Sequence, residues 1–191
     1  MSRIVSFRQM KDGTKEDYEL LDAAEKEYAR GLADRVLEAV RRLDHSLEGY
    51  PVSRLGHSLQ AATRALRDGA DEEMVVGALL HDVGDELAPY NHAELAAAIV
   101  RPYVRPEVTW IVAQHGLFQN YYYVHHFGGD RNARERLRQH PWYEACVHFC
   151  AAWDQSSFDP DYRSEPLSTF EPMVRRIFAR PPHDPRYLAG S

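Results

Sequence analysis

Apolar residues recur three and four positions apart along most of the chain, which is the spacing that buries one face of an α-helix. Residues that favour helix ends divide this pattern, with Pro51 and Asp71 at starts and Gly84 and Gly116 at ends. The helices predicted in this way cover residues 15–47, 51–70, 71–84, 92–101, 105–116, 141–155 and 168–182. No alternating stretch is long enough to predict a strand. We therefore expect an all-α fold, a bundle of roughly eight helices.

The composition is typical of a soluble globular protein, with 191 residues, 44% hydrophobic and 27% charged, and one domain is expected. The formal charge of −6 argues against broad nucleic-acid binding, which needs a basic surface. No apolar run is long enough to span a membrane, and the first twenty residues lack the apolar core of a signal peptide. Two cysteines are too few for a disulfide framework. A cytoplasmic protein without a nucleic-acid or membrane partner is expected.

Two His-Asp pairs occur in the sequence, and their surroundings differ. His81-Asp82 follows the apolar run MVVGALL, which must be buried, whereas His183-Asp184 lies between prolines in a C-terminal tail. A carboxylate that such a helix carries inward needs a partner, because burying an unpaired charge is expensive. A metal ion, an arginine or a capped helix end would each serve.

Four other polar residues stand at helix ends or on apolar helix faces: His57, His92, His115 and Asp154. Each has an ordinary alternative. His92 could assist a helix N-terminus, His115 could interact with a helix C-terminal dipole, and Asp154 could be a surface acid. Together with the first His-Asp pair, however, they supply four imidazoles and two carboxylates on separate helices. A two-metal site in a helical bundle requires such a set.

The order His, His-Asp, His, His, Asp resembles the HD-domain superfamily. It is most similar to the diiron oxygenase branch, which includes myo-inositol oxygenase and the phosphonate-cleaving HD-domain oxygenases. The similarity is closest over residues 54–84 and continues more loosely through NHAELAAAIV, VAQHG and AAWDQ. It implies a single HD domain over residues 1–191, with an N-terminal helical segment at 1–46, a metal-binding core at 50–155, and a C-terminal helix and Pro-rich tail at 156–191.

By that resemblance the six residues form two ligand sets around a shared carboxylate: His57, His81 and Asp154 for one iron, His92 and His115 for the other, and Asp82 bridging both. The resemblance also implies a mixed-valent Fe²⁺/Fe³⁺ pair with dioxygen as cosubstrate. The expected function is a nonheme diiron oxygenase that oxidises or oxidatively cleaves a small hydroxylated substrate.

Two other functions fit the same residues. A metal-dependent HD-domain phosphohydrolase would use all six ligands, with manganese or cobalt as the metal, to attack a nucleotide or another phosphate ester. A regulatory HD module would keep the metal with little catalysis. The local similarity favours the oxygenase.

Several positions depart from the pattern of the phosphonate-cleaving enzymes. Leu47 and Tyr50 replace the ends of a Tyr-x-x-Glu element, and Tyr50 joins Asp82 as a candidate catalytic residue. Asp85, Gln119 and Ala151 stand where a histidine, a lysine and an arginine are expected. Because a dianion needs concentrated positive charge in a pocket, we expect a neutral or amine-bearing substrate.

The looser stretch at 117–141 is the expected wall of the substrate site. The full set of candidate substrate contacts is Asp85, Gln119, Tyr122, His125, His126 and Arg131. The alternative is that the tyrosines pack in the core and the arginines lie on a solvated helix face. The sequence indicates no oligomeric state.

Overall fold

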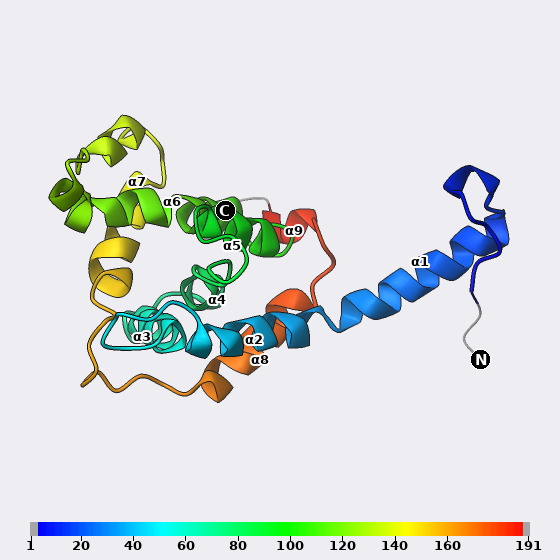
Figure 1. Cartoon of the computed structure of the whole chain (residues 1–191), viewed down its shortest axis with the longest axis horizontal. Helices are drawn as coiled ribbons and strands as arrows, with labels where there is room; N and C mark the ends of the chain where they lie inside the picture. Colours follow the sequence, from blue (N-terminus) through cyan, green and yellow to red (C-terminus); the bar gives the residue numbers. More distant parts are fainter. Residues whose placement is uncertain (1–3, 189–191) are drawn as a thin grey trace.

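The computed structural model describes residues 4–188, and all of its regular structure is helical, as expected (Figure 1). Residues 1–3 and 189–191, which belong to the expected N-terminal segment and tail, lie outside the described residues. The α-helices are α1 (Lys15–Arg30), α2 (Leu32–Arg42), α3 (Arg54–Arg67), α4 (Glu72–Leu80), α5 (His92–Val100), α6 (Pro106–Tyr123), α7 (Tyr143–His148), α8 (Leu167–Phe178) and α9 (Pro185–Leu188). The 3₁₀ helices are η1 (Met10–Asp12), η2 (Leu43–His45), η3 (Val124–Phe127) and η4 (Ala133–Leu137), and η5 (Phe149–Asp154) is a π-helix.

Side chains fix where several helices begin. Thr14 and Asp17 form a reciprocal capping box at the start of α1. The Ser53 hydroxyl accepts from the backbone N–H of Gly56 at 3.1 Å, so α3 begins at Arg54 rather than at Pro51. Asp71 caps α4 in the same way, as its position in the sequence indicates.

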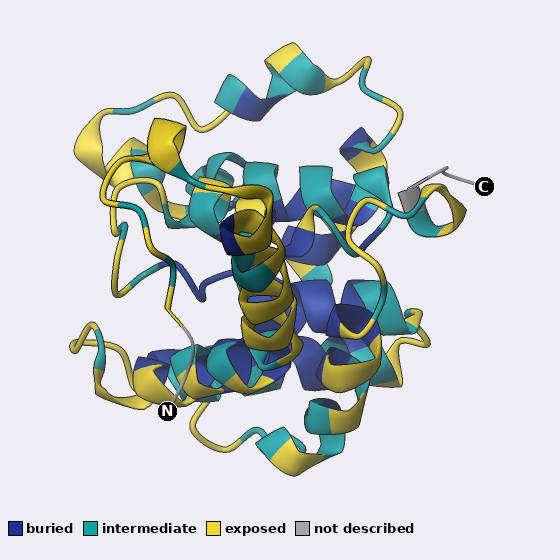
Figure 2. Ribbon diagram, turned by 90° about the vertical axis from the view of Figure 1, so that its right-hand side faces the viewer, coloured by how far each residue is buried: buried dark blue, intermediate teal, exposed yellow. Residues whose placement is uncertain are grey.

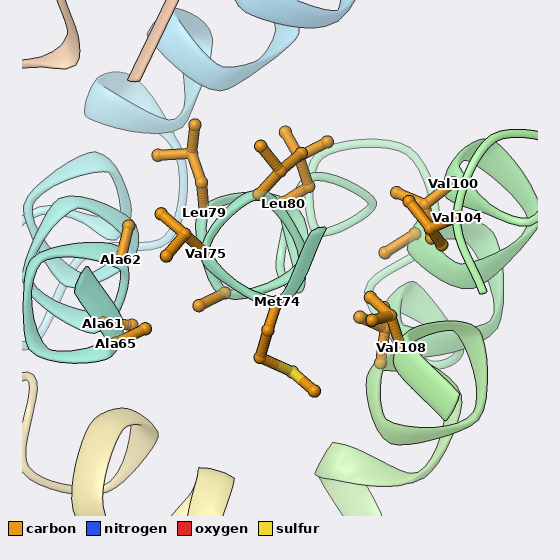
Figure 3. Close-up of a cluster of buried hydrophobic side chains, with 14 of the residues drawn as sticks. Ala61, Ala62, Ala65, Met74, Val75, Leu79, Leu80, Val100, Val104 and Val108 are labelled. Carbon is orange, nitrogen blue, oxygen red and sulfur yellow. The ribbon is translucent and has the colours of Figure 1, made fainter. Parts of the chain in front are cut away.

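Helix α4 lies at the centre of the bundle (Figure 3). Every residue from Met74 to Leu80 is buried, which fits a helix that is apolar on all sides. Three alanines of α3 (Ala61, Ala62 and Ala65) face it on one side, and Val100, Val104 and Val108 face it on the other. None of the described helices combines the length and the apolar character needed to cross a lipid bilayer.

Helix α1 projects from the body of the molecule (Figure 1). Figure 2 shows it exposed along nearly its whole length in front of the buried helices, and Asp17 is its one buried residue. The sequence predicts one helix over 15–47, but the chain changes direction at Gly31, whose N–H bonds the carbonyls of Tyr28 and Ala29 and so ends α1.

Two other expected helices differ from the structure. Helix α6 continues through Gly116 to Tyr123, because the residues that follow, including the fully buried Phe118, pack against the core. The predicted helix at 141–155 changes to a π-helix at Phe149. Neither change follows from apolar spacing alone.

Gly84 allows α5 to approach the end of α4 closely. A Cβ atom at this position would lie 2.6 Å from the carbonyl oxygen of His92 and 3.0 Å from its Cα. These are backbone atoms that cannot rotate away, so a side chain here must displace the start of α5. By contrast, a Cβ at Gly116 would meet nothing within 4 Å.

We predict that these two glycines respond oppositely to alanine. Gly84→Ala should lower the free energy of unfolding by about 1–3 kcal/mol, the usual cost of overpacking. Gly116→Ala should raise it by about 0.5–1 kcal/mol, because alanine is the better residue inside a helix. Urea denaturation of both variants measures the difference. Equal stability of the two variants would show that α5 is not held against Gly84.

Candidate metal centre

Five segments of the chain bring the six candidate ligands together around the inner end of α4. His57 lies in the first turns of α3, and His115 lies within α6. The others lie at helix ends: His81 and Asp82 after α4, His92 at the start of α5, and Asp154 at the end of η5. All are buried except His92, whose side chain is 24% exposed.

Asp82 is the residue on which the two halves of the site converge. Its Oδ1 lies 3.3 Å from Nε2 of His92 and 3.4 Å from Nε2 of His115. Its Oδ2 lies 3.3 Å from Nε2 of His57 and 3.2 Å from Nε2 of His81. Each carboxylate oxygen therefore faces a different pair of imidazoles, as a carboxylate that bridges two cations must.

Asp154 lies beside His57 and His81, the pair of imidazoles that faces Oδ2 of Asp82. Oδ1 of Asp154 lies 3.2 Å from Nε2 of His57 and 3.7 Å from Nε2 of His81, while its other oxygen is buried and has no hydrogen-bond partner among residues 4–188. The two Nε2 atoms of His57 and His81 are 3.0 Å apart. Ligand atoms held about 2.1 Å from one ion lie about 3.0–3.4 Å from each other, so these atoms can share an ion.

Hydrogen bonds on the outer side of the rings fix which nitrogen faces inward. His81 and His115 each place Nδ1 2.7 Å from the backbone carbonyl three residues earlier, and His57 places Nδ1 3.0 Å from the carbonyl of Ser157. A carbonyl only accepts, so Nδ1 carries the proton and Nε2 turns its lone pair to the centre. Facing lone pairs repel unless a cation lies between them. The donor set therefore fits two metal ions.

The charges of the centre favour a cation as well. Burial lowers the pKa of His57, but hydrogen bonds to Asp154 and Asp82 outweigh it and raise the pKa to about 9. Burial raises the pKa of Asp82, yet the charges of His81 and Arg54 hold it well below its ordinary value. Metal binding at His57 therefore has to release a proton from this ring.

Arg54 belongs to the site, although the sequence analysis did not single it out. Its Nη2 forms an ion pair with Asp82 Oδ2 at 2.6 Å, and its Nε donates to Asp85 Oδ2 at 2.7 Å. An arginine was one of the partners expected for Asp82, and it is present beside the imidazoles. The spacing of Arg54 and His57 indicates its place in the site, because residues three positions apart lie on the same face of a helix.

A cavity of about 970 Å³ opens beside the centre, and aromatic rings form much of its wall. Phe158 stacks on the ring of His57 at 4.4 Å, and Tyr50 stacks on Phe158 at 4.9 Å. Tyr123 and Phe127 also line the cavity. Its further polar lining residues include Arg54, Asp85, Glu86, Gln119 and His126.

The candidate substrate contacts divide into two groups. Asp85, Gln119 and His126 line the cavity, as does the candidate catalytic Tyr50. Two of them are already engaged: Asp85 pairs with Arg54, and Gln119 donates to Asp154 Oδ1 at 3.2 Å.

The other three candidates, Tyr122, His125 and Arg131, are not among the described residues that line the cavity, so their contact with a substrate stays a prediction. Because α6 continues to Tyr123, Tyr123 rather than Tyr122 turns to the cavity, since successive helical residues point about 100° apart. Tyr122 packs against the core, and the Arg131 guanidinium lies over the ring of Tyr121.

Comparison with known proteins agrees with this geometry. The family model described as HD domain matches residues 42–148, more than half of the chain. The chain belongs to the HD domain family. The matched range contains the ligands from His57 to His115, and Asp154 follows it within η5.

One curated relative of this HD domain is the [1-hydroxy-2-(trimethylamino)ethyl]phosphonate dioxygenase (glycine-betaine-forming) of Leisingera caerulea. The two are 34% identical over 92 residues, which cover 42% of this chain and 47% of the relative. The chain thus spans about half the length of the curated relative that it matches.

We predict that this HD domain binds two metal ions per chain. His92→Ala should reduce the metal content from two ions to one, because it removes a ligand of one group, and Asp82→Ala should reduce it at both positions. His183→Ala is the matched control, since it changes the exposed histidine of the second His-Asp pair. Elemental analysis after anaerobic loading with Fe²⁺ gives the counts. Two ions retained in His92→Ala, or a single ion in the native chain, would contradict the two-group arrangement.

Proposed function

We propose that this HD domain is a nonheme diiron oxygenase that oxidises or oxidatively cleaves a small hydroxylated substrate. The observation that carries the proposal is the carboxylate of Asp82, with each oxygen facing its own pair of imidazoles beside an open cavity. The Leisingera relative is named as a dioxygenase, and this similarity supports an oxygenase activity for the HD domain described here.

The residues present would hold the irons as two unequal sets. His57, His81 and Asp154 would bind one ion, His92 and His115 the other, and Asp82 both. Bound as a mixed-valent Fe²⁺/Fe³⁺ pair, they would supply a Lewis acid for the substrate hydroxyl and an electron source for dioxygen.

The surrounding side chains have separate tasks. Arg54 holds the bridging carboxylate of Asp82 in place and compensates the charge of Asp85. Gln119 fixes the orientation of the Asp154 carboxylate through its amide N–H. The stacked rings of Tyr50 and Phe158 cover His57 and keep water from that side of the centre.

The cavity wall favours a substrate with a cationic amine. Tyr123 and Phe127 present aromatic rings to the cavity, and the faces of such rings attract cations. The substrate in the relative's name carries a trimethylamino group as well as a phosphonate. Arg54 is the one guanidinium among the lining residues, and two carboxylates already engage it. We therefore propose that the amine, rather than an anionic group, is the principal handle on the substrate.

The reaction class can be tested with the reduced iron protein. Dioxygen uptake should appear when hydroxylated amines are supplied, the relative's substrate among them, and Asp82→Asn should abolish it. The parallel experiment supplies a panel of phosphate esters to manganese or cobalt protein without dioxygen. Robust anaerobic release of phosphate, lost in Asp82→Asn, would replace the oxygenase by the phosphohydrolase.

Recognition of the substrate through its cationic amine can be tested by measuring binding, without turnover. Choline should bind better than its neutral isostere 3,3-dimethylbutan-1-ol by about 2- to 30-fold, which corresponds to about 0.5–2 kcal/mol of cation–π attraction. Tyr123→Leu should remove much of that preference. Tyr90→Leu should leave it unchanged, because Tyr90 is fully exposed and does not line the cavity. Equal binding of the two alcohols by the native protein would contradict the proposal.

A further inference from the structure

The helix that carries Asp154 is irregular just before this ligand. Helix α7 ends at His148 and passes directly into the π-helix η5. The backbone N–H of Gln155 bonds the carbonyl of Cys150 at 3.0 Å, a span of five residues. A π-turn holds one residue more than an α-turn, so every side chain after it is rotated relative to α7. The direction of Asp154 depends on this extra residue.

Asp68 contacts both ends of the irregular segment. It lies at the C-terminal cap of α3, and its Oδ2 accepts from Nε1 of Trp153 at 3.0 Å. The same oxygen lies 2.6 Å from Nε2 of His148. The Trp153 side chain is buried beside the ligand Asp154, so its orientation is not free.

The spacing of these two partners distinguishes a π-helix from an α-helix. His148 and Trp153 are five residues apart, and in an α-helix of 3.6 residues per turn such positions point about 140° apart. One carboxylate oxygen could not reach both. In a π-helix each backbone N–H bonds the carbonyl five residues earlier, so side chains five positions apart point to nearly the same side of the helix. Asp68 therefore contacts a pair that only the π-helical form brings together.

We propose that Asp68 is a positioning residue, which holds the π-helical form of η5 and thereby turns Asp154 toward the metal centre. Other bonds of α3 secure the chain beyond η5: Gln60 donates to the carbonyl of Asp159 at 2.8 Å, and Arg64 to that of Ser156 at 2.9 Å. Helix α3 thus supplies His57 directly and places Asp154 indirectly. The proposal rests on the metal centre described above and is independent of the oxygen chemistry.

The effect should be larger at one of the two metal positions than at the other. Asp154 belongs with His57 and His81, and its direction depends on η5. The other group meets η5 less directly, where Cys150 Sγ donates to the backbone carbonyl of His115 at 3.5 Å. A residue that merely stabilised the fold would weaken both positions alike. The ratio of the two affinities therefore separates positioning from general stability.

The experiment is a titration of the full chain with Co²⁺ alone, followed by visible absorption and calorimetry. Asp68→Ala should weaken the binding of one of the two ions by about 10-fold, the lower end of the loss seen when a direct hydrogen-bond partner of a metal ligand is removed, and weaken the other ion clearly less. Glu165→Ala is the matched control, because the hydrogen bonds of Glu165 go to Arg67 and Thr63 of α3 on the same surface. It should change neither affinity.

A second variant keeps the test valid if Asp68→Ala folds poorly. Trp153→Phe retains a ring but removes the N–H, so it should weaken the same ion, and it should add little in the Asp68→Ala background. Unchanged affinities in both variants, or equal losses at both positions, would overturn the positioning role while leaving the metal centre intact. A native chain that binds no Co²⁺ would instead overturn the metal centre itself.

Discussion

The site depends on one buried carboxylate that faces two pairs of imidazoles at the same time. Asp82 occupies that position because it follows α4, the helix that neighbours surround on all sides. The packing that fixes α4 therefore also fixes the shared ligand, with α3 on one side and α5 and α6 on the other. Small residues make this convergence close enough: the alanines of α3 let it approach α4, and Gly84 admits the start of α5. The packing of the hydrophobic core consequently determines the geometry of the polar centre.

The centre and the cavity wall come from different parts of the chain. The ligands lie on helices or next to their ends, and backbone or side-chain hydrogen bonds hold each of them. The wall comes largely from the connections, with Tyr50 before α3, Phe127 after α6 and Phe158 after η5. Rigid elements thus carry the groups whose mutual distances matter most, and loops carry the groups that select what enters.

The sequence predicts the helical fold and the six candidate ligands because both depend on local patterns and residue types. Apolar spacing identifies the helices, and imidazoles and carboxylates at their ends indicate the centre. What it misses is non-local. Asp68 reaches His148 across 80 positions, so no local pattern marks the π-helix that this contact accompanies. The end of α6 is missed because Gly116 is a weak helix former that packing of later residues overrides. For the same reason the sequence does not indicate that Tyr123, rather than Tyr122, turns to the cavity.

Two of the four rings owe their direction to the helix that carries or precedes them. His81 and His115 each place Nδ1 2.7 Å from the helical carbonyl three residues earlier. Such a ring is oriented as soon as its helix forms, without a distant partner. Two of the buried imidazoles can therefore take up their directions early in folding, before the long-range contacts of the site are complete.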